Sequence, residues 1–259
     1  MKTTIPTTPV TPYGGKIDTK KGEVALMFDN ISPKYDFLNH LLSMGIDKGW
    51  RKMAIAYLKN NPPKHLLDIA TGTGDFAISA LAINPGKITG VDISEGMLAV
   101  GRKKIQENGL EQKITLTYGD SENLPFPDNT FDAAIVAFGV RNFEHLDKGL
   151  SDIFRVLQSG SRFVVLEFSR PESFPVKQFY WFYFRFILPV IGKMVSKDAR
   201  AYTYLPESVK VFPDGQAFID RMTKAGFKNV TQKKLTFGIA SVYCGDKPSG
   251  KYKWRRAPW

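Results

Sequence analysis

The sequence has little of what metal sites and disulfides are made of. Its 259 residues include one cysteine, Cys244, and three histidines. A single cysteine cannot form an internal disulfide, and no Cys or His cluster has metal-ligand spacing, so we expect neither a crosslink nor a metal. This cysteine usage is typical of a reducing cytoplasm, and Cys244 is expected to be an inert core residue.

Long apolar runs are missing as well. The most apolar stretch, residues 176–191, is interrupted by two cations, a glutamine and a proline. It is also shorter than the roughly 20 residues of a membrane-spanning helix. Residues 1–21 contain no apolar core of a secretory signal and are expected to be a flexible tail. We therefore expect a cytoplasmic protein, with any membrane association on the cytoplasmic face.

Positive charge is abundant but unevenly distributed. The chain carries a net charge of +11, whereas residues 61–160 hold nine Lys or Arg against 13 Asp or Glu. Basic flanks around an acidic middle suggest contact with nucleic acid or an anionic membrane surface, although lysines that only confer solubility would give the same pattern. The basic, aromatic residues 246–259 suit transient attachment to an anionic leaflet, and a tail without function is the alternative.

From Lys64 onward, short apolar runs alternate with amphipathic segments. This order predicts a parallel sheet with helices on both faces. Ser94 and Asp214 are placed to cap two of the helices. The last two apolar runs, joined at Gly238, indicate an antiparallel pair. A doubly wound, Rossmann-like α/β sheet that ends in an antiparallel hairpin is the plan of class I methyltransferases that use S-adenosylmethionine, and this is the fold class that we predict.

The length suits one large domain with additions. We expect that domain over residues 22–245, with a helical lid over 22–60 and a helical insertion over 173–205. Consecutive aromatic residues crowd the insertion, and neighbouring helix positions point in different directions, so these side chains cannot all face one core. They are expected to cover a lipophilic substrate, a partner or a membrane surface, unless the helix is buried on most sides.

The turn after the first apolar run contains two glycines. Its Gly72-x-Gly74-x-x-Ala77 spacing fits the fingerprint that places a pyrophosphate at a helix N-terminus. Asp68 and Asp75 bracket this turn, however, and would repel a diphosphate. S-adenosylmethionine presents a cationic sulfonium and a cationic ammonium, so an acidic surround favours it. We predict cofactor contacts in this turn at Asp68, Gly72, Thr73 and Gly74.

Two later strand ends complete the predicted nucleoside site. Asp92 lies 20 residues after Gly72, where a carboxylate can accept both ribose hydroxyls. Asp120 and Ser121 follow the third strand, where an acceptor and a small polar neighbour can contact the adenine amino edge. The order and spacing of these residues together predict S-adenosylmethionine as the cofactor.

Longer segments are more specific. They include MFDNISPKYDFLNHLLSMGIDKGWRK (residues 27–52), FGVRNF (138–143) and YLPESVKVFP (204–213). With such segments in order from about Val24 to Gly245, the chain resembles the ubiquinone/menaquinone biosynthesis C-methyltransferases. It departs from that family at Asp47, where the family usually has a histidine, and at Ala137, where many relatives have a hydroxyl.

The resemblance implies transfer of a methyl group from S-adenosylmethionine to a ring carbon of a polyprenylated quinol. Demethylmenaquinol is preferred on overall resemblance, and a ubiquinone precursor, 2-polyprenyl-6-methoxy-1,4-benzoquinol, is the alternative. Arg141 is expected to stabilise the phenolate and orient a proton acceptor, while Asn142 positions the ring. In the alternative interpretation Arg141 only pairs with Glu144 or Asp147. His145 is either another base or a helix-surface residue.

Tyr35 and Arg51 belong to the predicted lid, and Tyr202 and Tyr204 are expected to line the path of the prenylated substrate; plain packing is the alternative for Tyr35. An RNA methyltransferase is less favoured, because no RNA-binding module is present and the aromatic residues are not interleaved with Lys or Arg. A non-catalytic binding module would be indicated by a lack of cofactor binding. The expected partners are therefore the quinol and an anionic membrane, without nucleic acid, and a homodimer is left open.

Overall fold

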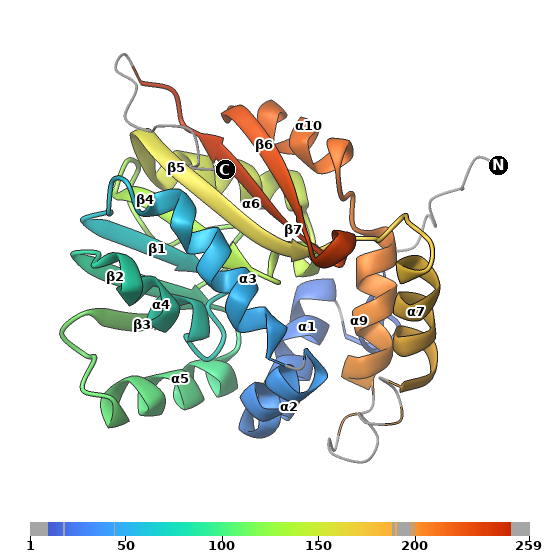
Figure 1. Cartoon of the computed structure of the whole chain (residues 1–259). Coiled ribbons are helices and arrows are strands. Elements are labelled where there is room, and N and C mark those ends of the chain that lie inside the picture. The colour runs from blue at the N-terminus through green and yellow to red at the C-terminus, as the bar shows by residue number, and fades with distance from the viewer. Residues whose placement is uncertain are drawn as a thin grey trace.

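In the computed structural model, the described residues are 10–17, 19–43, 45–187, 190, 198 and 200–249. Their centre is a seven-stranded sheet with the order β3-β2-β1-β4-β5-β7-β6 (Figure 1). The strands are β1 (His65–Ile69), β2 (Lys87–Asp92), β3 (Ile114–Tyr118), β4 (Phe131–Ala137), β5 (Leu157–Phe168), β6 (Lys228–Leu235) and β7 (Ala240–Asp246). The first five pair in parallel, whereas β7 runs antiparallel to both β5 and β6. The predicted sheet and its terminal hairpin are confirmed.

Helices cover both faces of this sheet. One buried core contains side chains of α3 (Ile46–Ile55), α4 (Asp75–Ala80) and α5 (Glu95–Glu107). A second core contains side chains of α6 (Leu146–Val156) and α10 (Gln216–Lys224). Cys244 on β7 is buried within the first core, as predicted.

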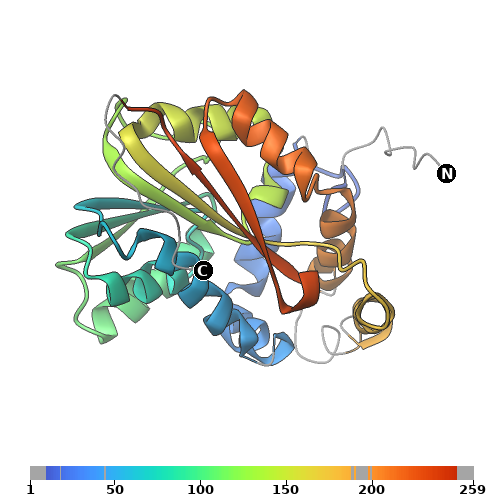
Figure 2. The same cartoon turned by 45° about the horizontal axis from the view of Figure 1, so that its top comes forward.

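A third group of helices lies beyond the carboxyl ends of the parallel strands (Figures 1 and 2). It comprises α1 (Lys20–Ile31), the turn η1 (Ser32–Lys34), α2 (Tyr35–Leu42), α7 (Val176–Phe182), the π-helical turn η5 (Tyr183–Ile187) and α9 (Arg200–Val211). Met27 and Ile31 of α1 share an apolar cluster with Tyr180 and Tyr202, so the N-terminal helices and the aromatic insertion pack against each other. Among the described residues, no helix is long and apolar enough to cross a membrane.

Of the two predicted helix caps, one is confirmed and one is not. Ser94 caps α5 as predicted, because its hydroxyl accepts a hydrogen bond from the backbone N–H of Met97 at 3.1 Å. The prediction that Asp214 caps α10 is wrong. The residue before that helix is Gly215, and the Asp214 carboxylate instead accepts hydrogen bonds from the backbone N and the Nε of Arg170.

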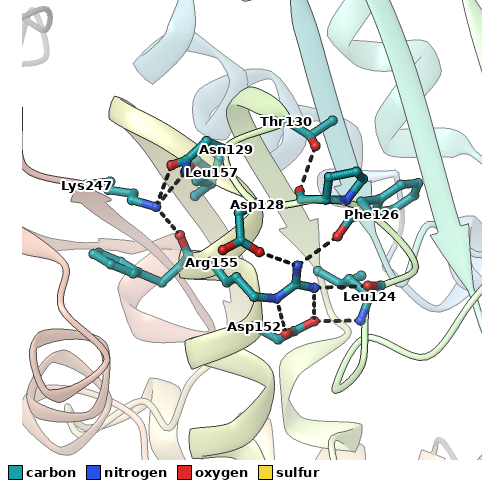
Figure 3. A network of polar contacts seen from close by, with 11 residues as sticks. Leu124, Phe126, Asp128, Asn129, Thr130, Asp152, Arg155, Leu157 and Lys247 are labelled. Atoms are coloured by element: carbon teal, nitrogen blue, oxygen red, sulfur yellow. Dashed lines mark hydrogen bonds and ion pairs between the residues drawn. The ribbon is translucent and has the colours of Figure 1, made fainter.

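Arg155 on α6 fixes the segment that connects β3 to β4 (Figure 3). Its guanidinium donates to the carbonyls of Phe126 and Leu124, at 2.8 and 3.0 Å, and pairs with Asp152 and Asp128. The Asp152 carboxylate also accepts the backbone N–H of Leu124 at 2.6 Å. The connection that begins with the turn after β3 is therefore anchored to the body of the domain.

Candidate active site

Cavities adjoin one another where the N-terminal helices cover the strand ends. The first lies between α1 and the turns after β1, β2 and β3, and Gly72, Asp92 and Asp120 line it. The second lies between α1, α9 and the turn after β4. Tyr35 and Asn142 line both cavities. This is the edge at which doubly wound sheets bind their ligands.

Asp92 joins two turns at the wall of the first cavity. Its Oδ2 accepts the backbone N–H of Gly72 at 2.8 Å, and its Oδ1 accepts that of Ser94 at 2.9 Å. Burial raises the pKa of Asp92, and these backbone donors act in the opposite direction. A carboxylate offers about four acceptor positions, so Asp92 keeps acceptor capacity for a ligand hydroxyl in the cavity. Gly72 has a φ of 56°, and a Cβ at this position would meet nothing within 4 Å, so the space beside it is open.

Hydrogen bonds of Asp68 and Thr73 hold the rest of the glycine turn in place. Asp68 accepts the Thr71 hydroxyl at 2.6 Å, lies outside the lining of the first cavity, and has a pKa that burial raises to about 7. The Thr73 hydroxyl donates to Asp36 of α2 at 2.5 Å. Gly74, with a φ of 81°, precedes α4. Of the residues predicted to contact the cofactor in this turn, Gly72 faces the first cavity, whereas Asp68 and Thr73 hold the turn in place.

Asp120 and Ser121 both line the first cavity, together with a residue that sequence reasoning missed. Lys21 of α1 places its Nζ 2.5 Å from Asp120 Oδ2 and 3.4 Å from Glu122 Oε2. Burial lowers the pKa of Lys21, but its bonds to the two carboxylates outweigh this effect, and the net shift is upward. This ion pair joins α1 to the turn after β3.

Arg141 is paired, but not with Glu144 or Asp147. Its Nη1 lies 2.8 Å from Oε1 of Glu167, and its backbone N–H donates to Oε2 of the same side chain at 3.3 Å. Glu167 is fully buried near the end of β5, and the Arg141 guanidinium lies 5.4 Å from the centroid of the Phe168 ring. Burial raises the pKa of Glu167, and Arg141 counters this shift. Glu167 was not identified from the sequence. Its position near the end of β5, the strand next to β4, is the feature that could have indicated it.

Several buried polar atoms around the second cavity have no hydrogen-bond partner among the described residues. They are Asn39 Nδ2, Arg141 Nε, Asn142 Oδ1 and Tyr204 Oη. Leaving a buried polar group unpaired costs about 1–3 kcal/mol, so such groups are rare and need an explanation. These atoms include both donors and acceptors, which a ligand with ring hydroxyls would satisfy.

Three tyrosines line the second cavity, and all three were singled out from the sequence. Tyr35 comes from α2, and burial raises its pKa to about 12, so it is a neutral phenol at physiological pH. Tyr202 and Tyr204 come from α9, and burial raises the pKa of Tyr204.

Two other residues lie outside the first and second cavities. Arg51 is buried against Asp47 on its own helix, and its Nη2 lies 3.9 Å from Asp75. His145 is exposed at the start of α6 and borders a different surface groove. Within the described parts of the chain, no group of His, Cys, Asp or Glu side chains could hold a metal ion.

A third cavity of about 290 Å³ adjoins the second and is mainly apolar. The two share Asn39, Phe168 and Leu205. The remaining walls come from α3, α7, η5 and the tip of the last hairpin, η6 (Thr236–Gly238). The three cavities therefore form a series, from the first, which has acidic side chains among apolar ones, to the third, which is mainly apolar.

Known proteins are similar to this sequence over most of its length. Residues 16–247 match the model of the ubiE/COQ5 methyltransferase family. A demethylmenaquinone methyltransferase from Bacteroides fragilis is 49% identical, over 92% of this chain and 97% of the relative. A ubiquinone/menaquinone biosynthesis C-methyltransferase UbiE from Geobacter sulfurreducens is 45% identical, over 88% of this chain and 90% of the relative.

Solved structures share the fold at low sequence identity. The [4+2]-cyclase SpnF superposes with a TM-score of 0.63 at 18% identity, over 89% of this chain and 97% of that one. A Haemonchus contortus phosphoethanolamine N-methyltransferase in complex with S-adenosyl-L-methionine gives a TM-score of 0.56 at 16% identity, over 76% of this chain and 52% of that one. A cyclase and a methyltransferase on one fold show that the chemistry depends on the site residues.

Proposed function

The chain belongs to the ubiE/COQ5 methyltransferase family, and from this membership we propose the roles of its cavities. It is an S-adenosylmethionine-dependent C-methyltransferase, and its reaction is methylation of demethylmenaquinol to menaquinol. Relatives named demethylmenaquinone methyltransferase are 43–49% identical to this chain, and those named for both ubiquinone and menaquinone biosynthesis are 43–45% identical, so the upper end of the range favours demethylmenaquinol. The ubiquinone precursor is therefore the less favoured substrate.

The residues of the first cavity suit S-adenosylmethionine. Asp92 retains acceptor positions for the ribose hydroxyls, and Asp120 and Ser121 are proposed to contact adenine. The open space beside Gly72 allows a ligand to approach the backbone closely. Carboxylates in the lining suit a cationic ligand better than a diphosphate. When bound, S-adenosylmethionine supplies an electrophilic methyl group.

The second cavity is proposed to hold the quinol ring. A ring carbon becomes nucleophilic when the neighbouring hydroxyl loses its proton, and the negative charge that develops on the oxygen must be stabilised. Arg141 provides a positive charge at this cavity, and Glu167 holds the guanidinium in place. Asn142 lines both cavities, so it is suited to orient the ring between them.

The unpaired Arg141 Nε and Asn142 Oδ1 are the observation that supports this role most directly. Deleting the gene and analysing the quinones of the strain tests the reaction. Demethylmenaquinone should accumulate, and the chain should restore menaquinone on re-expression. An unaltered quinone profile would overturn the proposed function.

The N-terminal helices, within residues 22–60, are proposed to act as a lid over the first cavity. Contacts between these helices and the turns of the first cavity support this role. Besides Lys21 with Asp120, Asp29 accepts hydrogen bonds from the Ser94 hydroxyl and from the backbone N–H of Gly96, at 2.6 and 2.8 Å. These contacts join α1 to the turns after β2 and β3, so we propose that the lid opens for the cofactor to exchange.

The third cavity, beside Tyr202 and Tyr204, is proposed to receive the prenyl chain. Its apolar walls suit a hydrocarbon, and the cavity adjoins the second through shared wall residues. Because the substrate is a membrane lipid, we also propose peripheral contact with an anionic bilayer. The basic C-terminal segment considered from the sequence lies mostly outside the described residues, in 250–259.

A further inference from the structure

The helix α7 and the turn η5 carry apolar side chains on both faces. On the inner face, Tyr180 and Phe184 are buried and line the third cavity. On the outer face, Phe182 and Phe186 are 55% and 54% exposed, and their rings are in contact, tilted by 45° at a centroid distance of 5.2 Å. A helix packed on one side normally exposes polar residues on the other. An apolar outer face of this kind marks an interaction surface.

Phe179 connects the two faces. Its side chain lines the third cavity and is nevertheless 70% exposed, so it stands at the mouth of that cavity. Thr236 of η6 also lines the cavity, and the next residue, Phe237, is 78% exposed. Phe237 has a φ of 56°, a left-handed conformation that costs energy in any residue with a side chain. An exposed aromatic ring held at such a cost indicates a functional role.

The charges around these rings are mainly positive, and the exposed acidic residue Glu172 is paired with Lys234 of β6 at 3.0 Å. The segment Val176–Ile187 contains the exposed Lys177 and Arg185 and no acidic residue. The strand that leads to Phe237, β6, contains three lysines and no acidic residue. Cations beside aromatic rings match an anionic bilayer, in which the rings sit at the headgroup level. A second copy of the chain would present the same positive charges to this surface and be repelled.

We propose that this docking face, formed by Phe179, Phe182, Phe186 and Phe237, inserts into an anionic bilayer and opens the third cavity directly to the lipid. A prenylated quinol would then pass from the leaflet past Phe179 without crossing water. The identity of this lipid rests on the proposed function. The docking itself rests on exposure, charge and the position of the cavity.

Vesicle binding tests the docking face with a matched pair of variants. Phe182→Asp removes a ring of the docking face that does not line any cavity described above, whereas Tyr118→Asp removes an equally exposed ring, at 54%, on β3. Burying one Phe side chain strengthens binding about tenfold or more. Phe182→Asp should therefore weaken co-sedimentation with phosphatidylglycerol vesicles about tenfold, while Tyr118→Asp should not. Equal binding by both variants would overturn the proposal.

Kinetics on two substrates separates docking from catalysis. Phe182→Asp should lower kcat/KM for long-chain demethylmenaquinol embedded in phosphatidylglycerol vesicles and leave it unchanged for a short-chain, water-soluble analogue. Equal loss on both substrates, or a dimer that Phe182→Asp converts to a monomer without vesicles, would contradict membrane docking. If the unaltered protein methylates neither substrate, the proposed function fails, while the vesicle-binding result still decides the docking face.

Discussion

The first and second cavities lie side by side but are built differently. Around the first, two carboxylates are paired with protein groups: Asp92 with the backbone of two turns, and Asp120 with Lys21. Around the second, buried polar atoms of Arg141 and Tyr204 lack partners among the described residues, as does Asn142 Oδ1 where the two cavities meet. With the proposed assignment of the cavities, the cofactor side is largely organised before a ligand arrives, whereas the substrate side relies on the ligand to complete its hydrogen bonds.

Replacing Arg141 by Ala should have the largest effect on turnover, and it should affect the second cavity without affecting the first. Turnover should fall about 10²–10³-fold, since a preorganised group that stabilises developing charge contributes this much. Affinity for S-adenosylmethionine should stay nearly intact, because Arg141 does not line the first cavity. Calorimetry for the cofactor and S-adenosylhomocysteine release for turnover provide the two values. Unchanged turnover would remove Arg141 from the mechanism, and Arg141→Lys shows whether charge alone is sufficient.

Replacing Asp92 by Asn should affect the first cavity. The amide can still occupy the space, but it is uncharged, so its hydrogen bonds to the backbone N–H groups and to the ribose hydroxyls are fewer and weaker. The Kd for S-adenosylmethionine should rise about 10–100-fold, corresponding to one or two hydrogen bonds to a charged group. With saturating cofactor, kcat should change much less than in Arg141→Ala. A lowered kcat with an unchanged Kd would contradict a role of Asp92 in binding the cofactor.

Asp68 provides a pH test of the support behind the glycine turn. Its pKa is about 7 in the fold, against about 3.9 in an unfolded chain. Between these values the folded state holds more protons, so this group makes the free energy of unfolding fall as pH rises, by at most about 1.4 kcal/mol per unit. Asp68→Asn cannot ionise. In urea titrations its stability relative to the unaltered protein should therefore increase from about pH 4.5 to about pH 7. A difference that does not vary with pH would contradict the buried, protonatable state.

Arg155 is a control outside both cavities. Arg155→Ala removes hydrogen bonds to two carbonyls and two carboxylates (Figure 3). We expect a loss of about 1–2 kcal/mol in the free energy of unfolding, measured by urea titration, because the side chain is partly exposed. Cofactor Kd and kcat should be unchanged in the folded enzyme. A change in either would show that the turn after β3 depends on this network.

The sequence predicts those parts of the site that depend on local spacing. Alternating runs predict the sheet, and polar residues after each strand end, such as Asp92 and Asp120, are brought to one edge by parallel pairing. Lys21 and Glu167 were missed because their partners lie 99 and 26 residues away, and only the packing of whole elements brings them together. Which side chains of a turn face the cavity also depends on backbone angles, so Thr73 was identified as important but its contact with Asp36 was not foreseen.

Methyl transfer by the purified protein tests the proposed use of the two cavities most directly. S-adenosylmethionine with a labelled methyl group is incubated with demethylmenaquinol, and the product is analysed by mass spectrometry and NMR. One labelled methyl group on the ring carbon and one S-adenosylhomocysteine per product are expected. Label on a ring oxygen, or no product although the cofactor binds, would contradict the assignment of the second cavity to a quinol ring.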